Sequence, residues 1–208
     1  DATFVAGWAP GGTNFVMPDD VGLELSGPAD SFILQVHYHN AAHHPDAFDK
    51  SGVALCTTDV PRPHTAGVYT LGTVHIDVPP HAKDYQASGA CGSFWTKYVP
   101  EPLHIVASFP HMHQLGRKLR TDIMRGADDG PIDTLVAVDP FSFDDQRYYA
   151  HDPPVVFQPG DGIRTTCTYD NPTNTAVHFG EKTEDEMCFN FVMLWPIDVF
   201  APGNRSCG

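Results

Sequence analysis

Short runs of β-branched, aromatic and aliphatic residues alternate with polar positions along this chain, and prolines and glycines separate the runs. The 208 residues include 19 prolines and 18 glycines. The period of two predicts strands, and no stretch keeps a helical period over several turns. Short strands between regular turn signals are typical of an all-β protein, an antiparallel β-sandwich or jelly roll. The expected strands are Ser31–His39, Val53–Thr57, Val68–Val78, Leu103–His113, Lys118–Met124, Ile132–Val138, Ile163–Tyr169 and Met187–Trp195.

The run Leu103–His113 ends in two histidines that are separated by one residue. Because strand side chains alternate, its odd-numbered positions share a face, which is apolar up to Phe109 and then carries His111 and His113. We therefore expect both imidazoles at the end of a buried strip, where they can converge on a copper, zinc, iron or nickel ion. By the same alternation His104 falls on the opposite face, as a core histidine bonded to the backbone.

A pair of histidines in a strand is a weak signal by itself, because the chain holds 12 histidines. The alternative is two polar side chains that bind no metal. His37, His39, His43 and His44 form a second group with the same ambiguity. A third ligand would separate a chelate from coincidence.

Met187 can supply that third ligand. In its strand it shares a face with Phe189, Phe191 and Met193. Methionine usually fills a core, and that interpretation stays open. The functional interpretation is a soft thioether ligand, since two imidazoles and one thioether favour Cu(I) and leave a position open for O2.

The cysteines allow two interpretations. None of the five forms a C-x-x-C pair, which argues against a zinc ribbon or a thioredoxin-type site. The odd count fits two disulfides and one free thiol, or five reduced cysteines in a cytosolic protein. A bridge between Cys167 and Cys188 would hold the Met187 strand in place.

The charge balance limits the partners. Lys and Arg total 12 against 26 Asp and Glu, a formal charge of −14. An acidic chain without a basic run argues against nucleic acid and anionic membranes as partners. No apolar run approaches the roughly 20 residues of a membrane helix.

Several motifs follow one another in a fixed order. They are L-Q-V-H-Y-H-N at residues 34–40, S-G-V at 51–53, P-P at 79–80, H-M-H-Q-L-G-R-K at 111–118, P-G-D at 159–161, C-T-Y at 167–169 and E-M-C at 186–188. Together they resemble the copper type II, ascorbate-dependent monooxygenases, from about Phe4 to Cys207. Each motif alone is weak, whereas their common order is specific.

The resemblance implies a copper ligand set. His111, His113 and Met187 would hold the catalytic copper, and His37 would be one ligand of a second, electron-transfer copper. The implied reaction is hydroxylation of a C–H bond with O2, with ascorbate as the reductant. The oxygen chemistry belongs to the metal.

The resemblance also implies a jelly-roll β-sandwich with disulfides Cys91–Cys207 and Cys167–Cys188, leaving Cys56 free. Each bridge is expected to contribute roughly 2–4 kcal/mol of stability. Disulfides imply an oxidising compartment, so the protein is expected to be secreted, periplasmic or extracellular.

The chain departs from the family pattern at the electron-transfer copper. The family has two β domains with one copper each, and an upstream His-His pair supplies two ligands of the first. Residues 1–62 would be the last strands of that first domain, and residues 63–208 the second domain. His37 would then lack its partners, which would lie in an N-terminal copper domain. The pair His43-His44 lies downstream, in an expected loop.

The expected substrate pocket also departs from the peptide-amidating members. Those members have an arginine at the position of Phe109 and a tyrosine at that of Phe191, which clamp a peptide carboxylate. Phenylalanines offer a buried carboxylate no donor. The functional prediction is a copper-dependent monooxygenase for a small apolar or aromatic substrate. The alternatives are a copper-binding or delivery module without turnover, and a β-sandwich adhesion domain with vestigial histidines.

Overall fold

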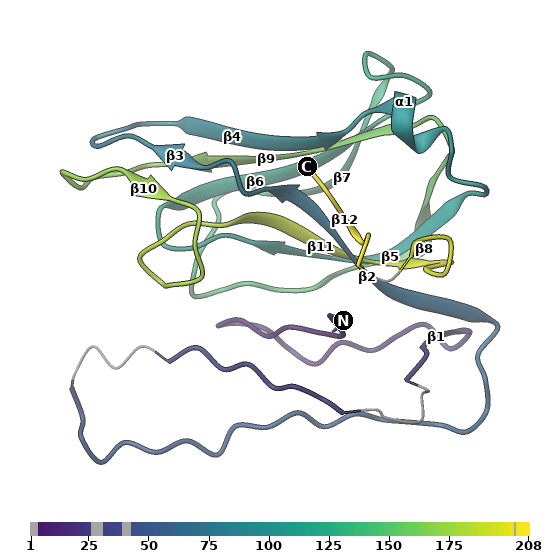
Figure 1. Ribbon diagram of the computed structural model, residues 1–208, viewed down its shortest axis with the longest axis horizontal. Coiled ribbons are helices and arrows are strands. Elements are labelled where there is room, and N and C mark those ends of the chain that lie inside the picture. The colour runs from purple at the N-terminus through teal and green to yellow at the C-terminus, as the bar shows by residue number, and fades with distance from the viewer. Residues whose placement is uncertain (1–3, 26–30, 39–42, 202) are drawn as a thin grey trace.

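A computed structural model describes residues 4–25, 31–38, 43–201 and 203–208. Two β-sheets pack face to face in these residues (Figure 1). Most neighbouring strands are antiparallel, whereas β1 and β12 run parallel to β2. The all-β sandwich is therefore confirmed, and the jelly-roll connection stays a prediction. Within the described residues no helix is long and apolar enough to cross a membrane.

The first sheet has the order β1-β2-β11-β5-β8, with β12 beside β2. Its strands are β1 (Val21–Leu23), β2 (His64–Thr73), β11 (Cys188–Trp195), β5 (Leu103–His111), β8 (Tyr149–Phe157) and β12 (Ser206–Cys207). The second sheet has the order β4-β9-β6-β7. Its strands are β4 (Tyr85–Cys91), β9 (Gly162–Tyr169), β6 (Gly116–Met124) and β7 (Ile132–Val138). Outside them, β3 (Asp77–Val78) pairs with β10 (Val177–His178), and α1 spans Ser93–Thr96.

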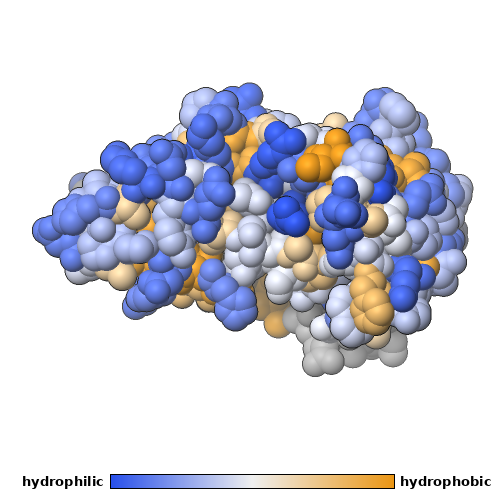
Figure 2. Space-filling model, turned by 90° about the horizontal axis from the view of Figure 1, so that it is seen from above, coloured by the Kyte–Doolittle hydropathy of each residue, from blue (hydrophilic) through white to orange (hydrophobic). Residues whose placement is uncertain are grey.

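The surface on the side of the second sheet is mostly hydrophilic, with small separate hydrophobic patches (Figure 2). The core therefore lies between the sheets, where Leu103 and Ile105 of β5 cluster with Ile123 and Leu135 of the second sheet. Burial of such side chains contributes about 25 cal/mol per Å² of apolar surface.

A β-bulge in β5 changes which side chains share a face. In the pairing with β11, Met193 lies opposite Ala107 and Leu194 lies opposite Ile105, so one extra residue enters β5 between these two pairs. Ile105 points into the sandwich, whereas Ala107 packs in the cluster on the outer face of the first sheet. The expectation of one face from Leu103 to His113 is therefore wrong.

The bulge also moves His104. It lies opposite Trp195 of β11 and its ring stacks on that indole at 3.8 Å, while His64 of β2 stacks on the same indole at 3.7 Å. His104 is thus on the outer face. Its expected place on the other face from His111 and His113 is wrong, because an inserted residue interrupts the period of two on which that expectation rests.

The outer face of the first sheet is covered by the chain's own N-terminal segment. Phe15, Met17 and Val21 pack there with Val106 and Met193. In Figure 1 this purple segment runs beneath β2 and β11. The strip that leads to the two histidines is therefore buried, as predicted, but it is buried under this segment instead of between the sheets.

Two expected strands do not form. The described part of Ser31–His39, residues 31–38, and the run Val53–Thr57 have no strand pairing. Their apolar side chains, among them Phe32 and Ile33, are exposed. A strand needs a hydrogen-bonding partner, and the described residues provide none for these two segments.

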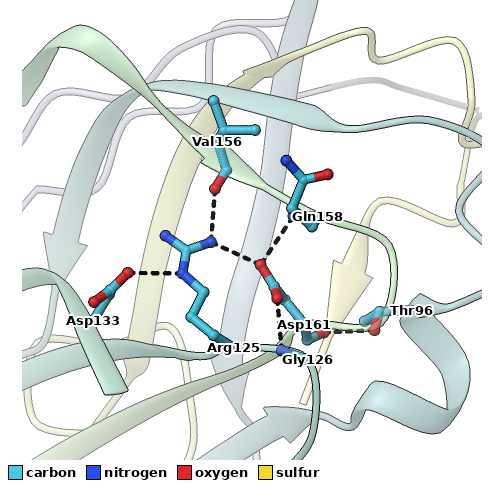
Figure 3. A network of polar contacts seen from close by, with 7 residues as sticks. All are labelled: Thr96, Arg125, Gly126, Asp133, Val156, Gln158 and Asp161. Carbon is cyan, nitrogen blue, oxygen red and sulfur yellow. Dashed lines mark hydrogen bonds and ion pairs between the residues drawn. The ribbon is translucent and has the colours of Figure 1, made fainter. Parts of the chain in front are cut away.

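An arginine fixes the end of β6 that lies farthest from His113 (Figure 3). Arg125 donates hydrogen bonds of 2.7 Å to Asp133, to the carbonyl of Val156 and to the carboxylate of Asp161. Asp161 is buried and also accepts two backbone N–H groups. This network joins the two sheets through β7, β8 and the turn before β9.

Candidate metal centre

The register between β5 and β11 brings the three expected ligands together. Phe189 lies opposite His111, and Phe191 lies opposite Phe109. Met187 lies one residue before β11 and His113 two residues after β5, and continuing the register past the strand ends sets them opposite each other. Directly opposed residues of paired strands point to the same side of a sheet. The two histidines and the methionine therefore share the outer face at one end of the first sheet.

Both imidazoles are held in an orientation that suits a metal. Their ring centroids are 5.3 Å apart and the rings are nearly perpendicular, at 84°. Nδ1 of His111 lies 2.7 Å from Oε1 of Gln146, and Nδ1 of His113 lies 2.9 Å from the carbonyl oxygen of Asp185. Because these oxygens only accept, each Nδ1 carries the proton and each Nε2 keeps its lone pair for a metal. The donor set fits copper.

Burial keeps these rings neutral. Burial, with a smaller contribution from the neighbouring His113, lowers the pKa of His111 to about 4. Burial also lowers the pKa of His113, against the opposing effect of its bond to the backbone of Asp185. A metal binds neutral imidazole, so protons compete weakly with a metal here at pH 7.

Glu186 ties the two ligand segments together. Its carboxylate is fully buried and accepts the backbone N–H groups of His113 at 3.0 Å, Leu115 at 2.6 Å and Met187 at 3.3 Å. Burial raises the pKa of Glu186 to about 7, although these three bonds favour the ionised form. Glu186 therefore fixes the backbone on both sides of the candidate site.

Met187 is fixed from its other side as well. The hydroxyl of Tyr169 donates to the Met187 carbonyl at 2.8 Å. The next residue, Cys188, is bridged to Cys167 of β9, with Cα atoms 5.8 Å apart, and both cysteines are fully buried. Tyr169 and this bridge connect Met187 to the second sheet, which limits the reach of its thioether.

The second bridge lies away from the candidate site. Cys91 at the end of β4 is bridged to Cys207 of β12, and Cys56 is free and exposed. Both pairings agree with those that the resemblance implies.

Aromatic rings surround His111, but they are not equally open. The Phe191 ring lies 6.1 Å from His111 and is partly exposed. Phe109 lies 6.3 Å from His111 and is only 3% exposed, because Tyr148 stacks on it at 4.6 Å and Gly7 approaches its ring. The Phe191 ring is therefore partly open to solvent, whereas Phe109 is covered.

His37 lies in a different part of the site. It lines a cleft of about 360 Å³ with Tyr38 and residues 181–184. Its ring nitrogen is 2.7 Å from Nε2 of Gln35, and its charge adds to the lowering of the pKa of His113. Across the described residues no three His, Cys, Asp or Glu side chains form a metal site. His39, which the sequence groups with His37, His43 and His44, lies outside the described residues.

Gln146 and Tyr148 were not singled out from the sequence. Both come from the stretch between β7 and β8, which has no strand or helix pattern of its own. A glutamine or a tyrosine in such a stretch carries no spacing signal, so only the folded chain shows that they touch His111 and Phe109.

Comparisons with known proteins agree with this geometry. Residues 64–203 match the family described as "Copper type II ascorbate-dependent monooxygenase, C-terminal domain". Tyramine beta-hydroxylase of Caenorhabditis briggsae is 33% identical over 207 residues, which cover 92% of this chain and 34% of that protein. Dopamine beta-hydroxylase of Canis lupus familiaris is 32% identical over 200 residues, which cover 92% of this chain and 32% of that protein.

DBH-like monooxygenase protein 1 of Gallus gallus is 30% identical over 206 residues, which cover 93% of this chain and 33% of that protein. The chain thus spans about a third of the length of these relatives. The family match covers β2 and every later strand except β12, and so includes both histidines and the methionine of the candidate centre. The chain belongs to the copper type II, ascorbate-dependent monooxygenase family.

Proposed function

We propose that His111, His113 and Met187 hold a copper ion, and that this chain is the catalytic-copper part of a monooxygenase. The substrate is a small apolar or aromatic molecule, which is hydroxylated at a C–H bond with O2 and with ascorbate as the reductant. One observation carries the proposal: two neutral imidazoles with bonded Nδ1 atoms share a face with a thioether from the adjacent strand.

Each residue has a defined task in this proposal. Bound copper would supply the O2 chemistry and accept the electrons that ascorbate provides. His111 and His113 present Nε2 lone pairs, because Gln146 and the Asp185 carbonyl hold their Nδ1 atoms. Met187 adds a soft ligand that favours Cu(I). The partly exposed Phe191 ring orients an apolar substrate beside His111 and excludes water from that side.

The names of two relatives support an aromatic substrate. They are called a tyramine and a dopamine hydroxylase, and both of those molecules carry an aromatic ring. Aromatic rings pack favourably against aromatic side chains such as Phe189 and Phe191. The surroundings of His111 contain phenylalanines and Tyr148, whose hydroxyl is already bonded to Gly7.

A larger protein is part of the proposal. In that protein the segments within residues 1–62 that lack strand partners here would complete a first copper domain, while β1 packs on the catalytic domain of residues 63–208. Phe32 and Phe48 are exposed in segments without strand partners, which is expected where a neighbouring domain is needed. His37 then belongs to the electron-transfer copper. The two disulfides support secretion or an extracytosolic location.

The test is turnover of an aromatic amine with ascorbate and O2, using this chain and the chain extended by its first domain. His111→Ala and Met187→Leu should each abolish hydroxylation, whereas Phe94→Ala, an exposed control on α1, should not. Retained turnover in either ligand variant would sink the proposal. Copper binding without turnover in both proteins would favour the alternative, a copper-binding or delivery module.

A further inference from the structure

The N-terminal segment is attached to the candidate centre by specific contacts. We call Phe4–Gly12 the strap. The hydroxyl of Tyr148 donates to the carbonyl of Gly7 at 2.9 Å and lies 3.4 Å from its N–H. The ring of Phe4 lies 5.2 Å from that of Phe191. The strap is therefore held across the outer face of β5 and β11.

One glutamine connects the strap to a metal ligand. The backbone N–H of Gln146 donates to the carbonyl of Pro10 at 2.8 Å, while its side-chain oxygen holds Nδ1 of His111 at 2.7 Å. The side-chain nitrogen of Gln146 donates to the carbonyl of Phe143 at 2.9 Å, which fixes the amide in that orientation. The position of the strap and the orientation of His111 thus depend on one buried residue.

The strap determines which aromatic rings near His111 remain exposed to solvent. It covers Phe109 through Gly7 and leaves a row of rings along β11. The row consists of Phe179 (39% exposed), the partly exposed Phe189 and Phe191, and Phe4 (46% exposed). Successive ring centroids are 6.0, 5.6 and 5.2 Å apart. Phe4 is the end of this row, next to the ring that faces His111.

Two glycines allow the strap to lie this close. A Cβ atom on Gly7 would lie 3.0 Å from the Phe4 ring and 3.9 Å from the Phe109 ring. Gly11 has φ +84°, and its Cβ would lie 2.5 Å from Cα of Asp145. A side chain at Gly11 would therefore lift the strap, because backbone atoms of the Gln146 segment cannot move aside.

We propose that the strap forms the outer wall of the substrate site and that Phe4 determines how large an apolar group fits beside His111. Phe4 closes one end of the aromatic row, so it limits the length of a ring system that lies along Phe189 and Phe191. This inference rests on the proposed function only for the place of the reacting C–H bond.

The test compares two neutral probes, ethylbenzene and 2-ethylnaphthalene. Their dissociation constants are measured by NMR titration of the chain, both metal-free and loaded with Cu(I). In Phe4→Ala the ratio of the two constants should shift by about tenfold or more toward the larger probe. Gly11→Ala should shift the ratio in the same direction.

Two matched variants serve as controls. Phe48→Ala removes a phenylalanine that is 83% exposed, and Gly203→Ala changes a glycine with φ +85° and open space around it. Neither should move the ratio. An unchanged ratio in Phe4→Ala would overturn the proposal, as would a failure of both probes to bind any variant. A shift in a chain that binds no copper would support the strap while contradicting the proposed function.

Discussion

Loss of the bridge Cys167–Cys188 should lower Cu(I) affinity more than loss of Cys91–Cys207, although it should lower the free energy of unfolding less. Cys167–Cys188 closes a sequence separation of 21 residues, whereas Cys91–Cys207 closes 116. Restriction of the unfolded chain grows with loop length, so the shorter bridge is worth about 3 kcal/mol and the longer one about 5 kcal/mol. Replacing both cysteines of the longer bridge with alanine should therefore destabilise the chain more.

Copper affinity should follow the opposite order. Cys188 follows Met187 directly and anchors it to β9, whereas Cys91 and Cys207 lie on β4 and β12. Loss of the shorter bridge frees the thioether and should weaken Cu(I) binding by roughly tenfold, within the range seen when the support of a ligand is removed. Loss of the longer bridge should leave Cu(I) affinity within about twofold, because it supports no ligand.

The assay has two parts. Urea unfolding of the metal-free variants gives the stability order, and competition with a Cu(I) chelator gives the affinity order. Cys56 is exposed and should be serine in every variant, since a free thiol also binds Cu(I). Equal losses of copper affinity in the two double variants, or a larger loss without the longer bridge, would refute the reasoning.

Three further predictions concern single residues. Glu186→Gln should lower Cu(I) affinity about 10- to 100-fold, measured by chelator competition, because at least one of three backbone N–H groups loses its acceptor. In metal-free protein His111 binds fewer protons folded than unfolded between pH 4 and 6.5, which lowers stability as pH falls, whereas Glu186, whose pKa is raised to about 7, raises stability as pH falls. Urea unfolding should therefore show His111→Gln gaining roughly 3 kcal/mol relative to the parent chain as pH falls from 6.5 to 4. Asp161→Ala should cost about 3–5 kcal/mol, measured by urea unfolding, because it leaves Arg125 partly buried and without this partner, while Cu(I) affinity stays unchanged.

The proximity of the two candidate histidine ligands could be predicted from the sequence, because their spacing keeps the same geometry in the folded chain. Two histidines at i and i+2 share a face wherever a strand forms, and the bulge precedes them, so it leaves their relation intact. Met187 was found by its place beside Cys188 in an ordered motif. The partners of the histidines were not found, because Gln146 reaches His111 across 35 positions of sequence.

The strands predicted from the sequence were wrong where hydrogen-bonded pairing with a neighbouring strand, and not the propensity of the residues, determines whether a strand forms. The run Tyr85–Cys91 has small and polar residues, and Tyr149–Phe157 contains two prolines, yet β4 pairs with β9 and β8 pairs with β5. Prolines are tolerated in β8 because it is an edge strand. In contrast, residues 31–38 have a strong strand pattern and no partner among the described residues.

The most direct test of the central claim is an anaerobic Cu(I) titration of this chain, followed by X-ray absorption of the loaded protein. We expect a copper bound by two imidazole nitrogens and one sulfur, which is lost in His111→Ala and loses its sulfur in Met187→Leu. Cys56→Ser should leave that sulfur in place. A copper whose sulfur survives Met187→Leu, or a stoichiometry that His111→Ala does not change, would contradict that claim.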